Sequence, residues 1–215
     1  MKSKKYELVE DDFILHEGRK LYRIRALKKI PKGVYTEVKK GQLGGYVEGY
    51  RNLSQEGKCW IFDDSRVYGN AVVRDSAVVI DDSEIYGNAI VKGCSEVSNR
   101  SQVYGNAIIR DNAKVYNRSK VFGNAVISNS AGVEDCAEVY GNVTVKGIAG
   151  VANFAMMSGN AEIFGAAIVK DRAMIVWMNN IKIHGGAVVV GPTELFDDPK
   201  ICGNAILNNN IIIVV

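Results

Sequence analysis

The sequence predicts an all-β protein, a parallel β-helix in which three hexapeptides make one coil. An apolar residue recurs at every sixth position from Val67 to Val169. A small residue nearly always lies two positions before it, and Gly, Asp or Asn lies two positions after it. The sequence Tyr-Gly-Asn-Ala, or a close variant, also recurs at every eighteenth position from Tyr68 to Tyr140. Because a fixed period is typical of solenoids, this spacing predicts the coil of a triangular prism.

Each hexapeptide is expected to form a short strand and a turn. Side chains alternate along a strand, so the small residue and the β-branched residue both point into the prism. Gly, Asn and Asp accept the left-handed backbone that a corner needs. A β-sandwich is the alternative, but its turns usually come every eight to twelve residues. Strict six-residue phasing therefore favours stacked coils, with six regular ones from Ser65 to Arg172.

The N-terminal part is expected to close one end of the prism. Residues 1–50 contain a Glu17-Gly18 turn signal followed by alternating polar and apolar residues, which predicts a β-hairpin cap. A cap is needed because an open prism exposes strand edges and apolar core. Residues 51–190 are assigned to the hexapeptide-repeat β-helix.

The C-terminal part departs from the repeat. Trp177 and Ile183 occupy positions held elsewhere by Gly, Asp or Asn, and the phase is expected to slip by two residues around Gly191 and Pro192. Residues 191–215 are therefore assigned to re-phased C-terminal coils. The sequence ends in IIIVV, an uncapped apolar strand. Such an edge invites pairing with another chain, which favours an oligomer.

The repeated pattern V-x-G-N-A-x resembles the hexapeptide repeat of left-handed parallel β-helix proteins, which include acyltransferases. The resemblance implies the left hand of the coil, which the period alone does not give. Three upstream segments extend the match: LYRIRALKKI (21–30), KKGQLGGYV (39–47) and NLSQEGKCWIF (52–62). With the repeats, they are similar to a family of phage- and prophage-encoded hexapeptide-repeat proteins, often labelled transferases. This family implies the fold and such an origin, and it carries over no activity.

Composition limits the classes of partner. A net charge of +3 does not indicate a nucleic-acid binder. No run of about 18 apolar residues is present and the first residues lack an apolar signal core, so no membrane association and a cytoplasmic location are expected. The cysteines have no metal-ligand spacing, which predicts free thiols and no metal site. They are Cys59, Cys94, Cys136 and Cys202.

A fixed coil length turns outward residues into columns along the rod. The aromatic column consists of Tyr68, Tyr86, Tyr104, Phe122 and Tyr140. The aliphatic stripe consists of Val72, Ile90, Ile108 and Val126. The basic column beside that stripe consists of Arg74, Lys92, Arg110 and Lys146. Arginines also recur at the third corner, at Arg100, Arg118 and Arg172.

These columns support a binding function without catalysis. The aliphatic stripe predicts a homo-oligomer, with a trimer favoured. The aromatic column stabilises the sheet by about 0.2–1 kcal/mol per pair and needs no ligand. If assembly brings it to a neighbour's basic column, the two can bind an anionic or nucleotide-like small ligand, or a partner at the inter-subunit surface. The prediction is a non-catalytic binding β-helix without a cofactor. A purely structural or adhesive rod, with the basic column as a solvated rim, is one alternative.

An acyl-CoA-dependent hexapeptide acyltransferase is the other alternative. The resemblance implies a histidine as general base and acetyl-CoA lying between subunits. His16 falls in the cap, so His184 is the candidate base in that case alone. The repeats lack the long loop that builds acceptor pockets in such enzymes. They also lack a Ser-His-Asp set, paired carboxylates or a Gly-rich phosphate loop. No catalytic residue is therefore assigned, and the chain is not expected to be an enzyme.

Overall fold

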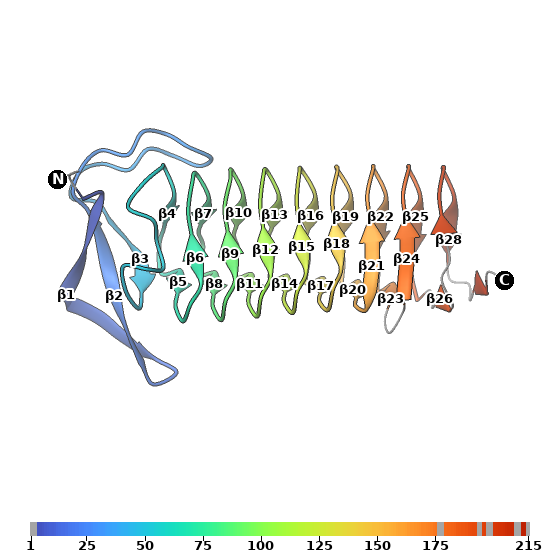
Figure 1. The fold of residues 1–215 in the computed structure, drawn as a ribbon, viewed down its shortest axis with the longest axis horizontal. Helices are drawn as coiled ribbons and strands as arrows, with labels where there is room; N and C mark the ends of the chain where they lie inside the picture. The colour runs from blue at the N-terminus through green and yellow to red at the C-terminus, as the bar shows by residue number, and fades with distance from the viewer. Residues whose placement is uncertain (1–3, 176–178, 193–194, 197–199, 209–211, 214–215) are drawn as a thin grey trace.

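A computed structural model describes residues 4–175, 179–192, 195–196, 200–208 and 212–213. These residues form strands, turns and loops, and no helix lies among them, so the all-β prediction is confirmed. Figure 1 shows the result as a rod of stacked coils with an antiparallel cap at its N-terminal end. The fold is a parallel β-helix of the left-handed type, as expected.

The cap is a long β-hairpin. Strand β1 (Tyr6–His16) pairs antiparallel with β2 (Arg19–Ala26). The turn between them holds Glu17 and Gly18 at positive φ (48° and 73°), which confirms the predicted turn. Strand β3 (Leu43–Val47) is antiparallel to β2 and parallel to β5. It lies within the range expected for the cap, and it joins the hairpin to the β-helix.

The remaining strands form three parallel sheets, the faces of the prism, in which neighbouring strands come from successive coils. After β3, the first face contains β5 (Arg66–Val67), β8 (Glu84–Ile85), β11 (Gln102–Val103), β14 (Lys120–Val121), β17 (Glu138–Val139), β20 (Met156–Met157) and β23 (Met174–Ile175). The second face contains β6 (Val72–Val73), β9 (Ile90–Val91), β12 (Ile108–Ile109), β15 (Val126–Ile127), β18 (Thr144–Val145), β21 (Asn160–Ile163), β24 (Asn179–Ile183) and β27 (Lys200–Ile201). The third face contains β4 (Trp60–Ile61), β7 (Val78–Val79), β10 (Glu96–Val97), β13 (Lys114–Val115), β16 (Gly132–Val133), β19 (Gly150–Val151), β22 (Ile168–Lys170), β25 (Val188–Val190) and β28 (Ile206–Asn208). A separate pair is formed by β26 (Leu195–Phe196) and β29 (Ile212–Ile213).

The core has the predicted register. Val67 pairs with Ile85 at the equivalent position of the next coil, and Val73 pairs with Val91 in the same way. These inward residues are fully buried, as is Ala71 of the small-residue series. Each coil therefore fills the prism with one β-branched and one small side chain per face, as the alternation of strand side chains requires.

The repeat Tyr-Gly-Asn-Ala is explained at the first corner, which joins the first face to the second. Gly69 has φ +66°, the left-handed conformation that the turn requires. The next residue, Asn70, donates its side-chain amide to the side-chain oxygen of Asn88 one coil later, at 3.0 Å. The same bond joins Asn88 to Asn106 at 2.9 Å and continues through Asn124. The glycine, the asparagine ladder and the buried alanine are thus architectural.

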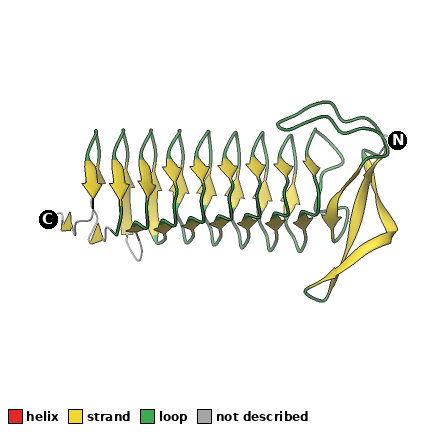
Figure 2. Cartoon of the chain, turned by 180° about the vertical axis from the view of Figure 1, so that it is seen from behind, coloured by secondary structure: helices red, strands yellow, loops and turns green. Residues whose placement is uncertain are grey.

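A loop between β2 and β3 was not anticipated by the sequence analysis. Figures 1 and 2 show it running from the cap over the first coils. Its two arms are joined by the bridge between Ile30 and Val38. Both residues belong to the main apolar cluster, together with the outward-facing Trp60 of β4 and Val78 of β7, which are buried. The loop therefore covers the start of the third face.

The phase slip lies earlier than expected. Met156 pairs with Met174 at the regular spacing, but Glu162 of β21 pairs with Lys182 of β24, which is two residues further along than the regular partner would be. Lys182 then pairs with Lys200, which restores the regular spacing. The two extra residues thus lie between β23 and Lys182, which corrects the position expected around Gly191 and Pro192. The register shifts within the pairing of β21 with β24, where a strand can bulge without losing the stack.

Two features named in the sequence fall largely outside the described residues. Trp177 is one of them. The apolar end IIIVV is the other, apart from the backbone of β29, whose strand pairs in parallel with β26.

Candidate functional site

The aromatic column is a continuous stack of rings next to the first corner. Ring centroids of successive coils lie 4.7–5.2 Å apart, and neighbouring rings are within 6° of parallel. Each ring therefore covers the faces of its neighbours, which leaves ring edges and hydroxyls for solvent or a ligand. Burial raises the pKa of Tyr86 to about 12 and also raises the pKa of Tyr104. This geometry fits the packing role better than base stacking on ring faces.

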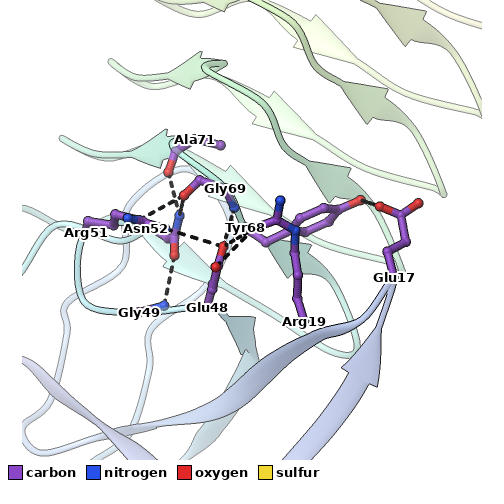
Figure 3. Close-up of polar contacts among 9 residues, drawn as sticks. All are labelled: Glu17, Arg19, Glu48, Gly49, Arg51, Asn52, Tyr68, Gly69 and Ala71. Atoms are coloured by element: carbon purple, nitrogen blue, oxygen red, sulfur yellow. Dashed lines mark hydrogen bonds and ion pairs between the residues drawn. The ribbon is translucent and has the colours of Figure 1, made fainter.

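The cap closes the N-terminal end of this stack. The His16 ring meets the Tyr68 ring edge-on, with centroids 5.2 Å apart. The Tyr68 hydroxyl donates to Glu17 at 3.5 Å (Figure 3). Beside the stack, Arg66 pairs with Glu84 at 2.6 Å and Lys120 with Glu138 at 3.0 Å. The charges on the first face thus neutralise each other along the rod.

A buried polar network ties the cap to the first corner, as Figure 3 shows. Asn52 is fully buried and donates its side-chain amide to the carbonyl oxygens of Gly69 and Ala71, at 3.0 and 2.9 Å. Its side-chain oxygen accepts the backbone N–H of Gly49 at 2.9 Å. Every polar atom of this side chain is therefore used within the chain, so the network is structural.

A carboxylate completes the same junction. Glu48 accepts the backbone N–H of Gly69 at 2.7 Å. It also forms an ion pair with Arg19 at 3.1 Å, and Arg51 approaches it at 3.5 Å. Glu48 follows β3 directly, so its position depends on the strand that the cap and the helix share.

The aliphatic stripe lies on the second face, one residue per coil. Ile90 pairs in register with Ile108, and Ile108 with Val126. All four stripe residues are only partly buried within the single chain. Strand partners on the same face cover them in part, and they form a flat apolar strip along the second face.

The basic column stands at the edge of the second face, next to the second corner, which joins the second face to the third. Within the described residues, Arg74 and Lys92 form no ion pair. Arg110 lies 3.6 Å from Asp111, its neighbour in the chain. Lys146 is bound to Glu162 at 2.5 Å, and that ammonium group lowers the pKa of the Glu162 carboxyl. The uncompensated positive charge is thus concentrated at the N-terminal half of the column.

This column continues into two rings that the sequence analysis did not place there. Phe164 lies one coil after Lys146, and the Lys146 ammonium lies 5.3 Å from its ring centre. His184 holds the equivalent place in the following coil, displaced along the sequence by the phase slip, and the two rings stack with centroids 4.7 Å apart. Phe164 could have been placed in this column from the sequence, because it lies one regular coil after Lys146. His184 could be placed there only from the strand pairing seen in the structure.

The His184 ring offers little to a base-catalysed reaction. Its Nε2 atom is shielded from water and has no hydrogen-bond partner among the described residues. A general base must reach the proton that it removes and is usually oriented by a second group. The side chain is held by stacking on Phe164 instead, so its geometry is that of a packed ring.

A groove runs along the third corner, which joins the third face to the first. Its volume is about 680 Å³. Two successive residues at this corner take positive φ in several coils, such as Asn99 and Arg100. The Asn99 side-chain amide donates to Asn117 at 2.8 Å, and Arg100 lies 3.6 Å from Asp82. Arg100 and Arg118 lie in the middle of this groove with aspartates on both sides of them, so its charge is mixed.

A smaller pocket of about 440 Å³ lies under the loop between β2 and β3. It is hereafter the loop pocket. Its lining residues are Lys32, Gly33, Val34, Lys58, Ser76, Cys94, Asn112 and Lys114. The sequence analysis missed it because the loop comes from the cap, far from Cys94 and Asn112 in the chain.

Comparison with models of protein families and with curated proteins found no match to this chain. The described residues contain no group of His, Cys, Asp and Glu side chains arranged to hold a metal ion. The four cysteine thiols are free. Among the residues with described structure, no helix suited to crossing a bilayer was found.

Proposed function

We propose that the protein is a non-catalytic binding β-helix that assembles into a homotrimer and holds an anionic, nucleotide-like ligand at the second face. One observation carries the proposal: Arg74 and Lys92 are without carboxylate partners in the described chain, beside an apolar strip of Ile90 and Ile108. An apolar strip favours subunit contact, and unpaired cations at its edge favour an anion. Origin in a phage or prophage and a cytoplasmic location remain part of this proposal.

The same site argues against an acyltransferase that uses acetyl-CoA. Such a reaction requires a reachable base, and His184 is packed against Phe164 with its Nε2 shielded. The aromatic column enters the proposal through its hydroxyls and ring edges, since stacking covers its faces. A purely structural or adhesive rod is the contrary result in the experiments below.

The double substitution Ile90→Glu with Ile108→Glu is expected to convert the trimer into a monomer. It would place two unpaired carboxylates in the subunit contact, where desolvation makes them costly. Light scattering after size-exclusion chromatography measures the change. Gly132→Glu with Gly150→Glu is the matched control, because these outward positions of the third face have open space and are likewise one coil apart. A wild-type monomer would contradict the trimer.

The double substitution Arg74→Ala with Arg110→Ala is expected to lower the stabilisation by nucleotides, cyclic nucleotides or sugar phosphates. For the wild type, a ligand at a hundredfold excess over its dissociation constant should add about 2.7 kcal/mol to the free energy of unfolding. Thermal unfolding with and without each ligand measures it. Arg100→Ala with Arg118→Ala removes the same charge from the third corner and should leave the shift intact. Equal thermal shifts in the wild type and both double variants would mean that the basic column is only a solvated rim.

A further inference from the structure

The loop pocket is lined by parts of the chain that are distant in sequence. The loop supplies Lys32, Gly33 and Val34, and the second corner and third face supply the opposite wall. The loop is held in place there: the Lys58 ammonium donates to the Lys32 carbonyl oxygen at 3.2 Å, and the ring of Tyr35 packs edge-on against Phe62 at 5.2 Å. The pocket is thus preformed within one chain.

Its charge is positive. Lys32, Lys58 and Lys114 all line it, and the one carboxylate paired with any of them in the described chain is Glu96, 3.6 Å from Lys114. Two nearby corner carboxylates do not line the pocket, and each accepts a backbone N–H. Asp75 accepts the backbone N–H of Gly93. Asp111 accepts that of Asn129 in the same way, at 3.0 Å. The lining of the pocket itself therefore carries three ammonium groups and no carboxylate.

The pocket also contains neutral donors. In the described part of the chain, the Ser76 hydroxyl and the Asn112 side-chain amide have no hydrogen-bond partner, and both line the cavity. The backbone N–H groups of Gly33 and Val34 are likewise without acceptors among described residues. Ammonium groups, a hydroxyl and free amides form the donor set that binds a tetrahedral oxyanion.

We propose that the loop pocket binds the phosphoryl group of a small organic phosphate. Its volume of about 440 Å³ lies within the range of small-molecule sites and leaves room beyond the phosphoryl group for an organic part. Carboxylate ligands are disfavoured because a dianionic phosphoryl group uses more of the donors. The site lies on the third-face side of the second corner and within one chain, so it depends on neither the trimer nor the basic column.

Isothermal calorimetry on the full chain tests the proposal with inorganic phosphate, pyrophosphate and AMP as probes. The double substitution Lys32→Gln with Lys114→Gln should weaken binding at least tenfold. Lys39→Gln with Lys40→Gln is the matched control, since both lysines are exposed in the same segment and do not line the pocket. Arg74→Ala with Arg110→Ala should keep the binding that Lys32→Gln with Lys114→Gln removes and lose only binding at the second face, which separates this site from the proposed function.

Thiol labelling locates the ligand independently of affinity. Cys94 is exposed and lines the pocket, whereas the exposed Cys202 lies far along the rod and serves as internal reference. Bound AMP should slow alkylation of Cys94 by at least threefold and leave Cys202 unchanged, as peptide mass spectrometry can measure. Equal binding of inorganic phosphate and AMP would assign the contacts to the phosphoryl group alone. No saturable binding, or binding unaffected by the lysine substitutions, would overturn the proposal.

Discussion

Replacing Asn52 with Asp is expected to lower the free energy of unfolding by about 3–5 kcal/mol. In the regular coils, the first residue of each second-face strand donates its backbone N–H to the carbonyl oxygen of the small residue one coil later. Val72, for example, donates to Ala89. At the start of the β-helix, the backbone N–H of Asn52 donates to the carbonyl oxygen of Gly49 instead. The Asn52 side-chain amide takes its place on the Ala71 carbonyl.

The aspartate removes that donor and places a carboxylate against carbonyl oxygens in a fully buried site. Its pKa should therefore be raised in the folded state, because the protonated form can still donate. The destabilisation should be small below the pKa of about 3.9 in the unfolded chain and grow as the pH rises above it. Urea unfolding at pH 4 and pH 7 measures both effects. Asn70→Asp, at an exposed position of the asparagine ladder, should cost less than about 1 kcal/mol; an equal loss would contradict the argument.

The coil was predictable because its physics is local and repeated. Val67, Val73 and Val79 point inward for one reason, and the same reason holds at each later coil, so every repeat tests the same inference again. Gly, Asn and Asp two residues later take positive φ, such as Asp75 at 63°. Because many positions support the same prediction, an exception at one of them does not change it.

The cap loop and the position of the phase slip were not predictable in this way. Each occurs once, so no repetition reveals it. The loop is placed by long-range burial of Trp60 and Val78, whose outward register gave no sign that another segment covers them. The slip lies in a stretch where Ile181 and Ile183 are both apolar and both buried, so that hydrophobicity alone fits two registers.

The candidate sites were predicted unevenly for the same reason. The residues of each column follow from counting along the repeat, whereas the ion-pair partners of its charged residues do not. Lys146 was counted with Arg74 in the basic column, but Glu162 neutralises it from the next coil. The aromatic column was expected to stabilise the sheet by packing, and parallel stacking at about 4.8 Å between strands brings neighbouring rings into contact.

Replacing Gly105 with Ala is expected to lower the free energy of unfolding by about 2–4 kcal/mol. Its φ is +69°, where a side chain is strained. An added Cβ would also lie 2.9 Å from the backbone nitrogen of Gly123 in the next coil. Because the obstacle is backbone, the coils themselves would have to separate at the first corner, which would also disturb the asparagine ladder beside it.

Gly132→Ala separates this steric effect from the general preference of strands for alanine over glycine. Gly132 points outward from β16, has no positive φ and has open space around the position of a Cβ. Its substitution should raise stability by about 0.4–1 kcal/mol, since alanine restricts the unfolded chain. Urea unfolding of both variants should therefore give changes of opposite sign. Equal small changes would show that the corner can widen without cost, and that the recurrence of glycine at the first corner does not depend on the close approach of successive coils.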